Sequence, residues 1–234
     1  MKRVVVFSGA GMSAESGLKT FRDSGGLWES YDVNEVATPE AWQRNPELVL
    51  EFYNKRRDQV LKAVPNHAHK SIAKLEEKFI VDVVTQNIDD LHERAGSSRV
   101  LHLHGEILKA KSINSELPLY DVRAPLEWGK SLAEDGSQLR PHIVWFGESV
   151  PEYDNAQRII SKADILIIVG TSLNVFPAAG LVFHAQKSCK SYLVDPNELE
   201  SPGLPSMHLI QKPATIGIPR LVEELLGTAK LQDA

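Results

Sequence analysis

The 234-residue sequence contains a single cysteine, Cys189, so no disulfide can form within the chain, as is usual in a reducing compartment. Its apolar runs are short, and the one at residues 165–169 is far below the roughly 20 residues that a membrane-spanning helix needs. The apolar stretch that follows Arg3 is too short for a signal peptide. A basic excess is absent as well, because the formal net charge is −5. We therefore expect a cytoplasmic protein that binds neither membranes nor nucleic acid.

An apolar heptad repeat of the kind that joins helices in oligomers is also missing, which favours a monomer. Hydrophobic residues make up 42% of the chain and charged residues 24%, and these ordinary values exclude a disordered protein. The length fits one main domain that carries a smaller one.

Short apolar runs rich in β-branched residues recur along the chain, and each ends in polar or glycine residues. These predicted strands are residues 3–7, 79–84, 100–103, 143–146, 165–169 and 192–194. The helical stretches between them are 46–63, 68–78, 153–162, 178–186 and 219–226. The alternation predicts an α/β fold with a Rossmann-like, doubly wound parallel sheet, in which ligands bind where the strands end.

Two segments interrupt the alternation, a long helical stretch and a polar one of little periodicity. We expect them to form a smaller domain from insertions at approximately 21–78 and 106–139. The large Rossmann-like domain would then consist of approximately 1–20, 79–105 and 140–234.

A glycine turn follows the first predicted strand, and residues 9–14 match the fingerprint G-x-G-x-x-G/A of dinucleotide-binding proteins. Such glycines let backbone amides approach a pyrophosphate, although a glycine turn after a strand can also be a turn and nothing more. An ordinary dehydrogenase fits poorly, because the next strand ends much later, close to Asp89.

Several separated motifs occur in one order along the chain. They are GAGMSAESG at 9–17, FRD at 21–23, TQNID at 85–89, HG at 104–105, FGE at 146–148 and GTSL at 170–173. In this order they resemble the sirtuins, which are NAD-dependent protein lysine deacylases, over residues 2–227. The resemblance implies NAD as cofactor, acyl-lysine proteins or peptides as substrates, transfer of the acyl group to ADP-ribose and release of nicotinamide.

The resemblance also implies two catalytic residues, His104 and Asn87. His104 matches the base that removes a proton from a ribose hydroxyl, and a neutral imidazole is available for this near pH 7. From the residues alone, a structural histidine at the end of a strand is the alternative. Asn87 matches a residue on the ribose side of the cofactor.

The cofactor site implied by the resemblance consists of strand-end and loop residues. They are Gly9, Ala10, Gly11, Met12, Ser13, Phe21, Arg22, Gln86, Asn87, Asp89, Gly170, Thr171, Ser172 and Asp195. Asp89 matches the contact to the nicotinamide amide, and Asp195 replaces the asparagine that usually contacts the adenine ribose. A polar residue at a strand end can also cap the next helix.

The substrate site implied by the resemblance consists of Val144, Phe146, Gly147 and Glu148, with Phe146 lining the lysine channel. Tyr53 and Arg56, three residues apart on one helix face, match the Tyr-x-x-Arg signature of sirtuins that prefer succinyl or malonyl groups. Arginine can pair with the terminal carboxylate of such a group. The alternative is an aromatic ring against the core beside a solvated cation.

The zinc cysteines of most sirtuins are absent. Their positions are occupied by Ser112, Ser115, Leu132 and Asp135, which cannot replace thiolates. We therefore expect no zinc site, and residues 106–138 are either held by other packing or mobile. His102, His104 and His142 are better explained as a catalytic base and two strand-end histidines than as metal ligands.

Two other functions fit the same motifs. One is a catalytically silent sensor of NAD or ADP-ribose, which the missing zinc site favours. The other is an NAD glycohydrolase or ADP-ribosyltransferase, which cleaves the same cofactor and needs no acyl channel.

Overall fold

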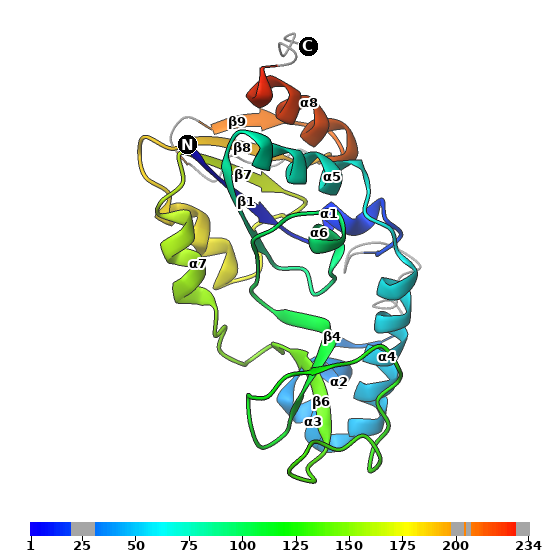
Figure 1. The fold of residues 1–234 in the computed structure, drawn as a ribbon. Helices are drawn as coiled ribbons and strands as arrows, with labels where there is room; N and C mark the ends of the chain where they lie inside the picture. The colour runs from blue at the N-terminus through cyan, green and yellow to red at the C-terminus, as the bar shows by residue number, and fades with distance from the viewer. Residues whose placement is uncertain (20–30, 198–203, 205–206, 228–234) are drawn as a thin grey trace.

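The computed structural model describes residues 1–19, 31–197, 204 and 207–227 (Figure 1). Its main sheet is parallel, and the strand order is β3-β2-β1-β7-β8-β9. The strands are β1 (Arg3–Ser8), β2 (Ile80–Thr85), β3 (Val100–His102), β7 (Ile165–Val169), β8 (Lys190–Val194) and β9 (Met207–Ile210). This order confirms the doubly wound, Rossmann-like prediction, with the direction of the winding changing beside β1.

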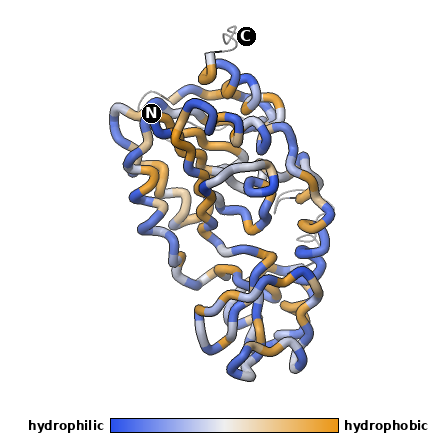
Figure 2. The backbone as a smooth tube through the Cα atoms, viewed as in Figure 1, coloured by the Kyte–Doolittle hydropathy of each residue, from blue (hydrophilic) through white to orange (hydrophobic). Residues whose placement is uncertain are grey.

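Helices cover both faces of this sheet. The helices around it are α1 (Gly11–Ala14), α5 (His67–Lys74), α6 (Leu91–Arg94), α7 (Tyr153–Ile160) and α8 (Ala214–Leu226), with 3₁₀ turns at Leu75–Glu77 and Ala178–His184. Side chains alternate along β1: Val4 and Val6 pack with α5 and α8, whereas Val5 and Phe7 pack with α7. Burial on both faces explains why the inner strands β1 and β7 read as continuous apolar runs, which form the hydrophobic centre of this layer in Figure 2.

A smaller antiparallel sheet lies at the end of the molecule opposite α8 (Figure 1). It contains β4 (Gly105–Ser112), β5 (Tyr120–Asp121) and β6 (Leu139–Ile143), and it lies beside α2 (Val33–Val36), α3 (Pro39–Arg44) and α4 (Pro46–Lys62). The Asn45 side chain accepts a hydrogen bond from the Leu48 amide and so caps the start of α4. Ile107 and Ile143 of this sheet share a buried cluster with Val49 and Phe52 of α4.

Three sequence predictions were wrong about local structure. The strand expected at 143–146 is instead β6 at Leu139–Ile143, because the backbone turns away after Ile143 although the apolar residues continue. The helix expected to begin at Pro219 begins at Ala214, and Pro219 lies inside it. Residues 178–184 form a 3₁₀ turn.

The first insertion packs against both layers. Helix α5 contacts α8, and its Ala68 and Ile72 belong to the core of the parallel sheet. We keep two domains as a proposal, with α5 assigned to the large one. No helix in the described part of the chain is both long and apolar enough to cross a membrane.

Candidate active site

The strands of the parallel sheet end at one edge. Ser8 pairs with Thr85 on one side and Val169 on the other, and Val169 pairs with Val194. The residues that follow these strand ends therefore lie at the same edge of the sheet. They include Gly9, Gln86, Gly170 and Asp195, which the sequence placed in a cofactor site.

Two glycine turns interlock at this edge. The Gly9 amide donates to the Val169 carbonyl at 3.0 Å, and the Gly11 amide donates to the Gly170 carbonyl at 2.9 Å. A Cβ atom on Gly9 would lie 2.7 Å from the Gly170 oxygen, and one on Gly170, where φ is +62°, would lie 2.2 Å from the Met12 amide nitrogen. The fingerprint glycines are therefore required by the contact between the two turns, whatever else they bind.

Polar side chains tie the loop after β2 to its neighbours. Asn87 Nδ2 donates to Ser13 Oγ at 3.1 Å, and the Asn87 amide donates to Thr85 Oγ1 at 3.0 Å. Gln86 Nε2 donates to Thr171 Oγ1 at 3.1 Å. The amides and hydroxyls expected at a cofactor site are thus brought together and held in place.

His104 has the geometry of a base. Its Nδ1 lies 3.1 Å from the Gln86 carbonyl, and a hydrogen bond to that oxygen requires a proton on Nδ1. The lone pair of Nε2 is then left as an acceptor. Burial lowers the pKa of His104, and the hydrogen bond to Gln86 opposes this only in part. The neutral imidazole therefore predominates at neutral pH.

His102, two residues earlier, has the opposite arrangement. Nδ1 lies 2.8 Å from the Asn87 carbonyl and Nε2 lies 2.8 Å from Glu93 Oε1, so both nitrogens donate. Burial lowers the pKa of His102, but the hydrogen bond and charge of Glu93 outweigh it and leave the pKa raised. An imidazole with two protons cannot bind a metal. Within the described ranges, no three histidine, cysteine, aspartate or glutamate residues form a metal-binding group.

Asp89 is buried, with 4% of its surface exposed. Its Oδ1 accepts a hydrogen bond from the Leu91 amide at 3.2 Å, and burial raises the pKa of its carboxyl. The hydrogen bond from the Leu91 amide and the positive charge of Arg56 act in the opposite direction.

Two neutral histidines lie beneath the edge. His92 Nε2 is 3.0 Å from Ser8 Oγ, His69 Nε2 is 3.5 Å from Ser13 Oγ, and the two rings are 4.9 Å apart. Burial lowers the pKa of His69 to about 4 and that of His92 well below its ordinary value.

The expected substrate loop is anchored to both layers. The Val144 amide donates to the His104 carbonyl at 3.0 Å, and the Phe146 amide donates to the Ala37 carbonyl at 3.0 Å. The Phe146 side chain is 47% exposed at the surface. The Glu148 carboxylate turns inward and accepts hydrogen bonds from Arg140 and from the Trp145 amide.

Helix α4 presents the two residues of the acyl-pocket signature. Tyr53 is 3% exposed and packs in one cluster with Trp145 and Ala37, and burial raises the pKa of its hydroxyl. Arg56 is half-buried, and its hydrogen bonds within the described ranges are long and go to neutral oxygens, from Nη1 to the Lys19 carbonyl at 3.4 Å and to Gln59 Oε1 at 3.3 Å.

The remaining expected residues are less informative. Phe21 and Arg22 lie outside the described residues. Asp195 Oδ1 accepts hydrogen bonds from the amide and the side chain of Asn197, and Ser172 is half-buried after β7. Sequence reasoning missed Arg140, since an arginine before a proline in a polar segment carries no distinguishing pattern.

Ser112 and Ser115, which stand where most sirtuins have zinc-binding cysteines, form hydrogen bonds. Ser112 Oγ lies 2.6 Å from Ser137 Oγ and 3.2 Å from Asp135 Oδ2. Ser115 Oγ donates to the Leu117 carbonyl at 2.6 Å, and Leu132 forms a bridge with Gln138. Other packing therefore holds this segment, as one of the two sequence alternatives proposed.

Comparison with known proteins identifies the family. The profile of the Sir2 family matches residues 9–177. The chain is 49% identical to an NAD-dependent protein deacylase of Bacteroides thetaiotaomicron, over 97% of this chain and 99% of that protein. It is 49% identical to one from Helicobacter pylori, over 98% of this chain and 100% of that protein.

Solved structures agree with this result. A Sir2 homologue in complex with NAD has a TM-score of 0.86 and 37% identity, over 97% of this chain and 90% of that one. A Sir2 homologue in complex with ADP-ribose has a TM-score of 0.87 and 35% identity, over 100% of this chain and 95% of that one. The chain belongs to the Sir2 family.

Proposed function

We propose that this protein is an NAD-dependent protein lysine deacylase that prefers acidic acyl groups, succinyl and malonyl, and also removes acetyl groups. The observation that carries the preference is Arg56, a half-buried cation beside the buried Tyr53 whose hydrogen bonds, among the residues that the structure describes, go to neutral oxygens. A cytoplasmic location and a monomeric state remain predictions.

The strand edge fits the cofactor by its donor set. Asn87 and Gln86 offer amides, Thr171 a hydroxyl and Asp89 a carboxyl group, which match the hydroxyls and the carboxamide of NAD. When bound, NAD supplies a ribose carbon that accepts the acyl oxygen and nicotinamide as the leaving group.

The protein's own part in the chemistry falls to His104. Its Nδ1 proton is held by the Gln86 carbonyl, so Nε2 can take a proton from a ribose hydroxyl. Burial keeps the pKa of His104 low, so the ring is in the accepting form at neutral pH. Asn87, which hydrogen-bonds Ser13 and Thr85, would orient the ribose.

The acyl preference follows from charge. A terminal carboxylate buried in the pocket needs a cation, and Arg56 provides one that no hydrogen-bonded carboxylate neutralises within the described part of the chain. Tyr53 would form part of the pocket wall, and Val33, which packs against the same buried cluster, would narrow the pocket and reduce the preference.

The test uses matched succinyl-lysine and acetyl-lysine peptides with NAD, with the products identified by mass spectrometry. We expect O-succinyl-ADP-ribose from the wild type. Replacing Arg56→Met should reduce kcat/KM for the succinyl peptide by about 10- to 100-fold, the effect of losing a charge-assisted hydrogen bond, and change the acetyl value by less than about twofold.

The matched control is Lys55→Met, because Lys55 is the neighbouring cation on α4 and pairs with Glu51 at the surface. It should leave both peptides unchanged. Equal losses for the two peptides in Arg56→Met would contradict the acid pocket. Intact NAD and peptide in every reaction would favour the sensor, and nicotinamide release without peptide would favour the glycohydrolase.

A further inference from the structure

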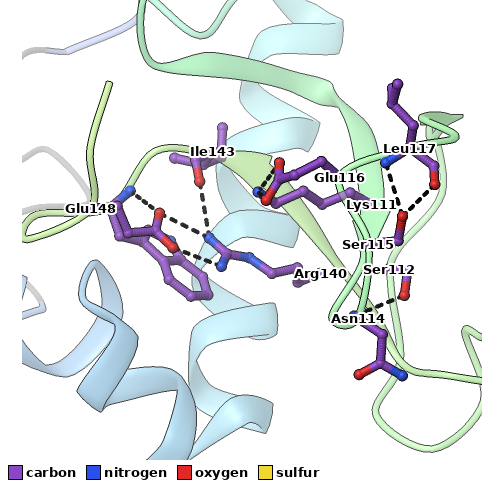
Figure 3. A network of polar contacts seen from close by, with 10 residues as sticks. Lys111, Ser112, Asn114, Ser115, Glu116, Leu117, Arg140, Ile143 and Glu148 are labelled. Atoms are coloured by element: carbon purple, nitrogen blue, oxygen red, sulfur yellow. Dashed lines mark hydrogen bonds and ion pairs between the residues drawn. The ribbon is translucent and has the colours of Figure 1, made fainter. Parts of the chain in front are cut away.

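Arg140 on β6 holds the expected substrate loop by two hydrogen bonds to one carboxylate. Nη1 donates to Glu148 Oε1 at 2.8 Å, and Nη2 donates to Glu148 Oε2 at 3.2 Å (Figure 3). The ion pair is largely buried, with 11% of the Arg140 side chain and 25% of the Glu148 side chain exposed. This parallel pairing fixes direction as well as distance, which a lysine cannot do.

The same guanidinium closes the loop at its other end. Nη2 donates to the carbonyl of Ile143, the last residue of β6, at 3.0 Å (Figure 3). The Arg140 guanidinium also lies 3.4 Å from the centre of the Trp145 ring. Arg140 therefore contacts the beginning, middle and end of the segment 143–148.

Hydrogen bonds within the loop complete this arrangement. Glu148 Oε2 accepts from the Trp145 amide at 2.7 Å, and the Glu148 amide donates to the Trp145 carbonyl at 3.0 Å. Phe146 and Gly147 form the outward tip between these anchors, and Gly147 has a φ of +92°. These anchors act together with the hydrogen bonds from the Val144 amide to the His104 carbonyl and from the Phe146 amide to the Ala37 carbonyl.

The neighbouring strand β4 carries a second cation, Lys111, which already has an acidic partner. Lys111 of β4 pairs with Arg140 in the register of the small sheet, and its Nζ forms an ion pair with Glu116 at 2.6 Å (Figure 3). Arg140 is thus the cation that hydrogen-bonds Glu148, and the charge of Lys111 has a smaller effect on the pKa of that carboxyl. Burial raises the pKa of Glu148, but Arg140 and the Trp145 amide outweigh it, so the carboxylate stays charged.

We propose that Arg140 is a positioning residue for the acyl-lysine channel, acting through Glu148 and Trp145 to hold Phe146 and Gly147 beside His104. This rests on the proposed deacylase function. Glu148, which the resemblance places among the substrate contacts, then acts on the substrate indirectly, because its oxygens are engaged within the loop.

The test measures steady-state kinetics and peptide affinity for Arg140→Lys, Glu148→Gln and the double variant, with an acetyl-lysine peptide so that the acid pocket plays no part. In each single variant we expect KM and the calorimetric Kd for the peptide to rise about tenfold. We expect kcat to stay within about twofold and KM for NAD to be unchanged. The double variant should be no worse than Arg140→Lys, because both changes break one interaction.

The control is Lys62→Gln, which removes an exposed ion pair with Asp58 on α4 and should change none of these values. Unchanged peptide KM in both single variants would overturn the proposal. So would a loss of kcat that parallels a fall in Tm, or additive losses in the double variant. A wild type without deacylation would instead refute the proposed function.

If Arg140→Lys fails to fold, Glu148→Gln decides alone, since glutamine keeps the size and one acceptor of the carboxylate. Its peptide KM must then rise at an unchanged Tm for the proposal to stand.

Discussion

The two sheets of this protein are stabilised in different ways. In the parallel sheet the side chains of Val4, Val5 and Val6 are fully buried, and the strand packs on both faces. In the small sheet β4 contains both buried and half-buried residues. The hydrophobic cluster around its Ala110 is small. Much of its loop structure depends on side chains that bind backbone.

Gln138 is the main example. Its Oε1 accepts from the Gly129 amide at 2.7 Å, and its Nε2 lies 3.1 Å from the Ser131 carbonyl and 3.0 Å from the Leu139 carbonyl. Where apolar burial is extensive, no single polar residue decides the structure. Where it is scarce, one side chain can hold a whole loop, and this contrast can be tested.

The largest expected effect is a loss of activity without a loss of stability, caused by replacing His104 in the parallel layer. His104→Ala should lower kcat by about 10²- to 10⁴-fold, the usual contribution of a general base. Tm should change little, because the core of that layer does not involve His104. Turnover of an acyl peptide and thermal unfolding are the two measurements.

The pH profile provides an independent check. Because the pKa of His104 is lowered, kcat/KM of the wild type should fall only as the pH drops below the ordinary range of an imidazole. The matched variant His184→Ala, an exposed histidine of the 3₁₀ turn, should retain full activity. Normal turnover in His104→Ala would mean that another residue is the base.

The second expected effect concerns the stability of the parallel layer in acid. His69 has a pKa of about 4 when folded and an ordinary one when unfolded, so the unfolded state binds more protons between these values. The free energy of unfolding should therefore decrease as the pH falls through this window, and His69 alone accounts for about 3 kcal/mol.

Chemical denaturation between pH 7.5 and 4.5 measures this slope. His69→Gln should flatten it, whereas His67→Gln, an exposed neighbour on α5, should leave it as in the wild type. Equal slopes in all three proteins would show that His69 is not held neutral by burial.

The smallest expected effect lies in the small layer. Gln138→Ala should destabilise the loop at 127–139 by about 2 kcal/mol, because buried backbone groups lose their partners. Amide hydrogen exchange should speed up there and not in β1 or β7. Lys130→Ala, an exposed change in the same loop, should have no such effect.

A chelator extends this prediction. EDTA should leave the exchange of the wild type unchanged, because Ser112, Asp135 and Ser137 join the loops by hydrogen bonds. Faster amide exchange of the wild type in EDTA would show that a metal ion helps to hold the small layer. Amide exchange in Gln138→Ala that rises equally in both layers would show that the two sheets are not stabilised differently.

The same contrast explains which features could be predicted from sequence. Buried parallel strands are apolar runs that end in polar turns, so β1, β2, β7 and β8 were found within two residues. The small sheet has no such signal. Val144 and Trp145 look like strand residues, yet they belong to a loop whose course depends on Arg140, and that contact has no local pattern.

At the candidate site, the strand-end residues could be placed at one edge because parallel strands share a direction. The tautomer of His104 and the double donation by His102 depend on carbonyls brought by the fold, and so did not follow from spacing. The low pKa of His69 likewise depends on burial that periodicity does not reveal.

The interlocked glycine turns have a consequence for engineering. Gly9 and Gly11 pack directly against Gly170. A Cβ atom at any one of the three positions would clash with backbone atoms of the facing turn, and backbone cannot move aside as a side chain can. Directed evolution that varies these positions singly will recover glycine, and altered cofactor use must come from their neighbours. Ser172 and Asp195 are the natural places to begin such a library.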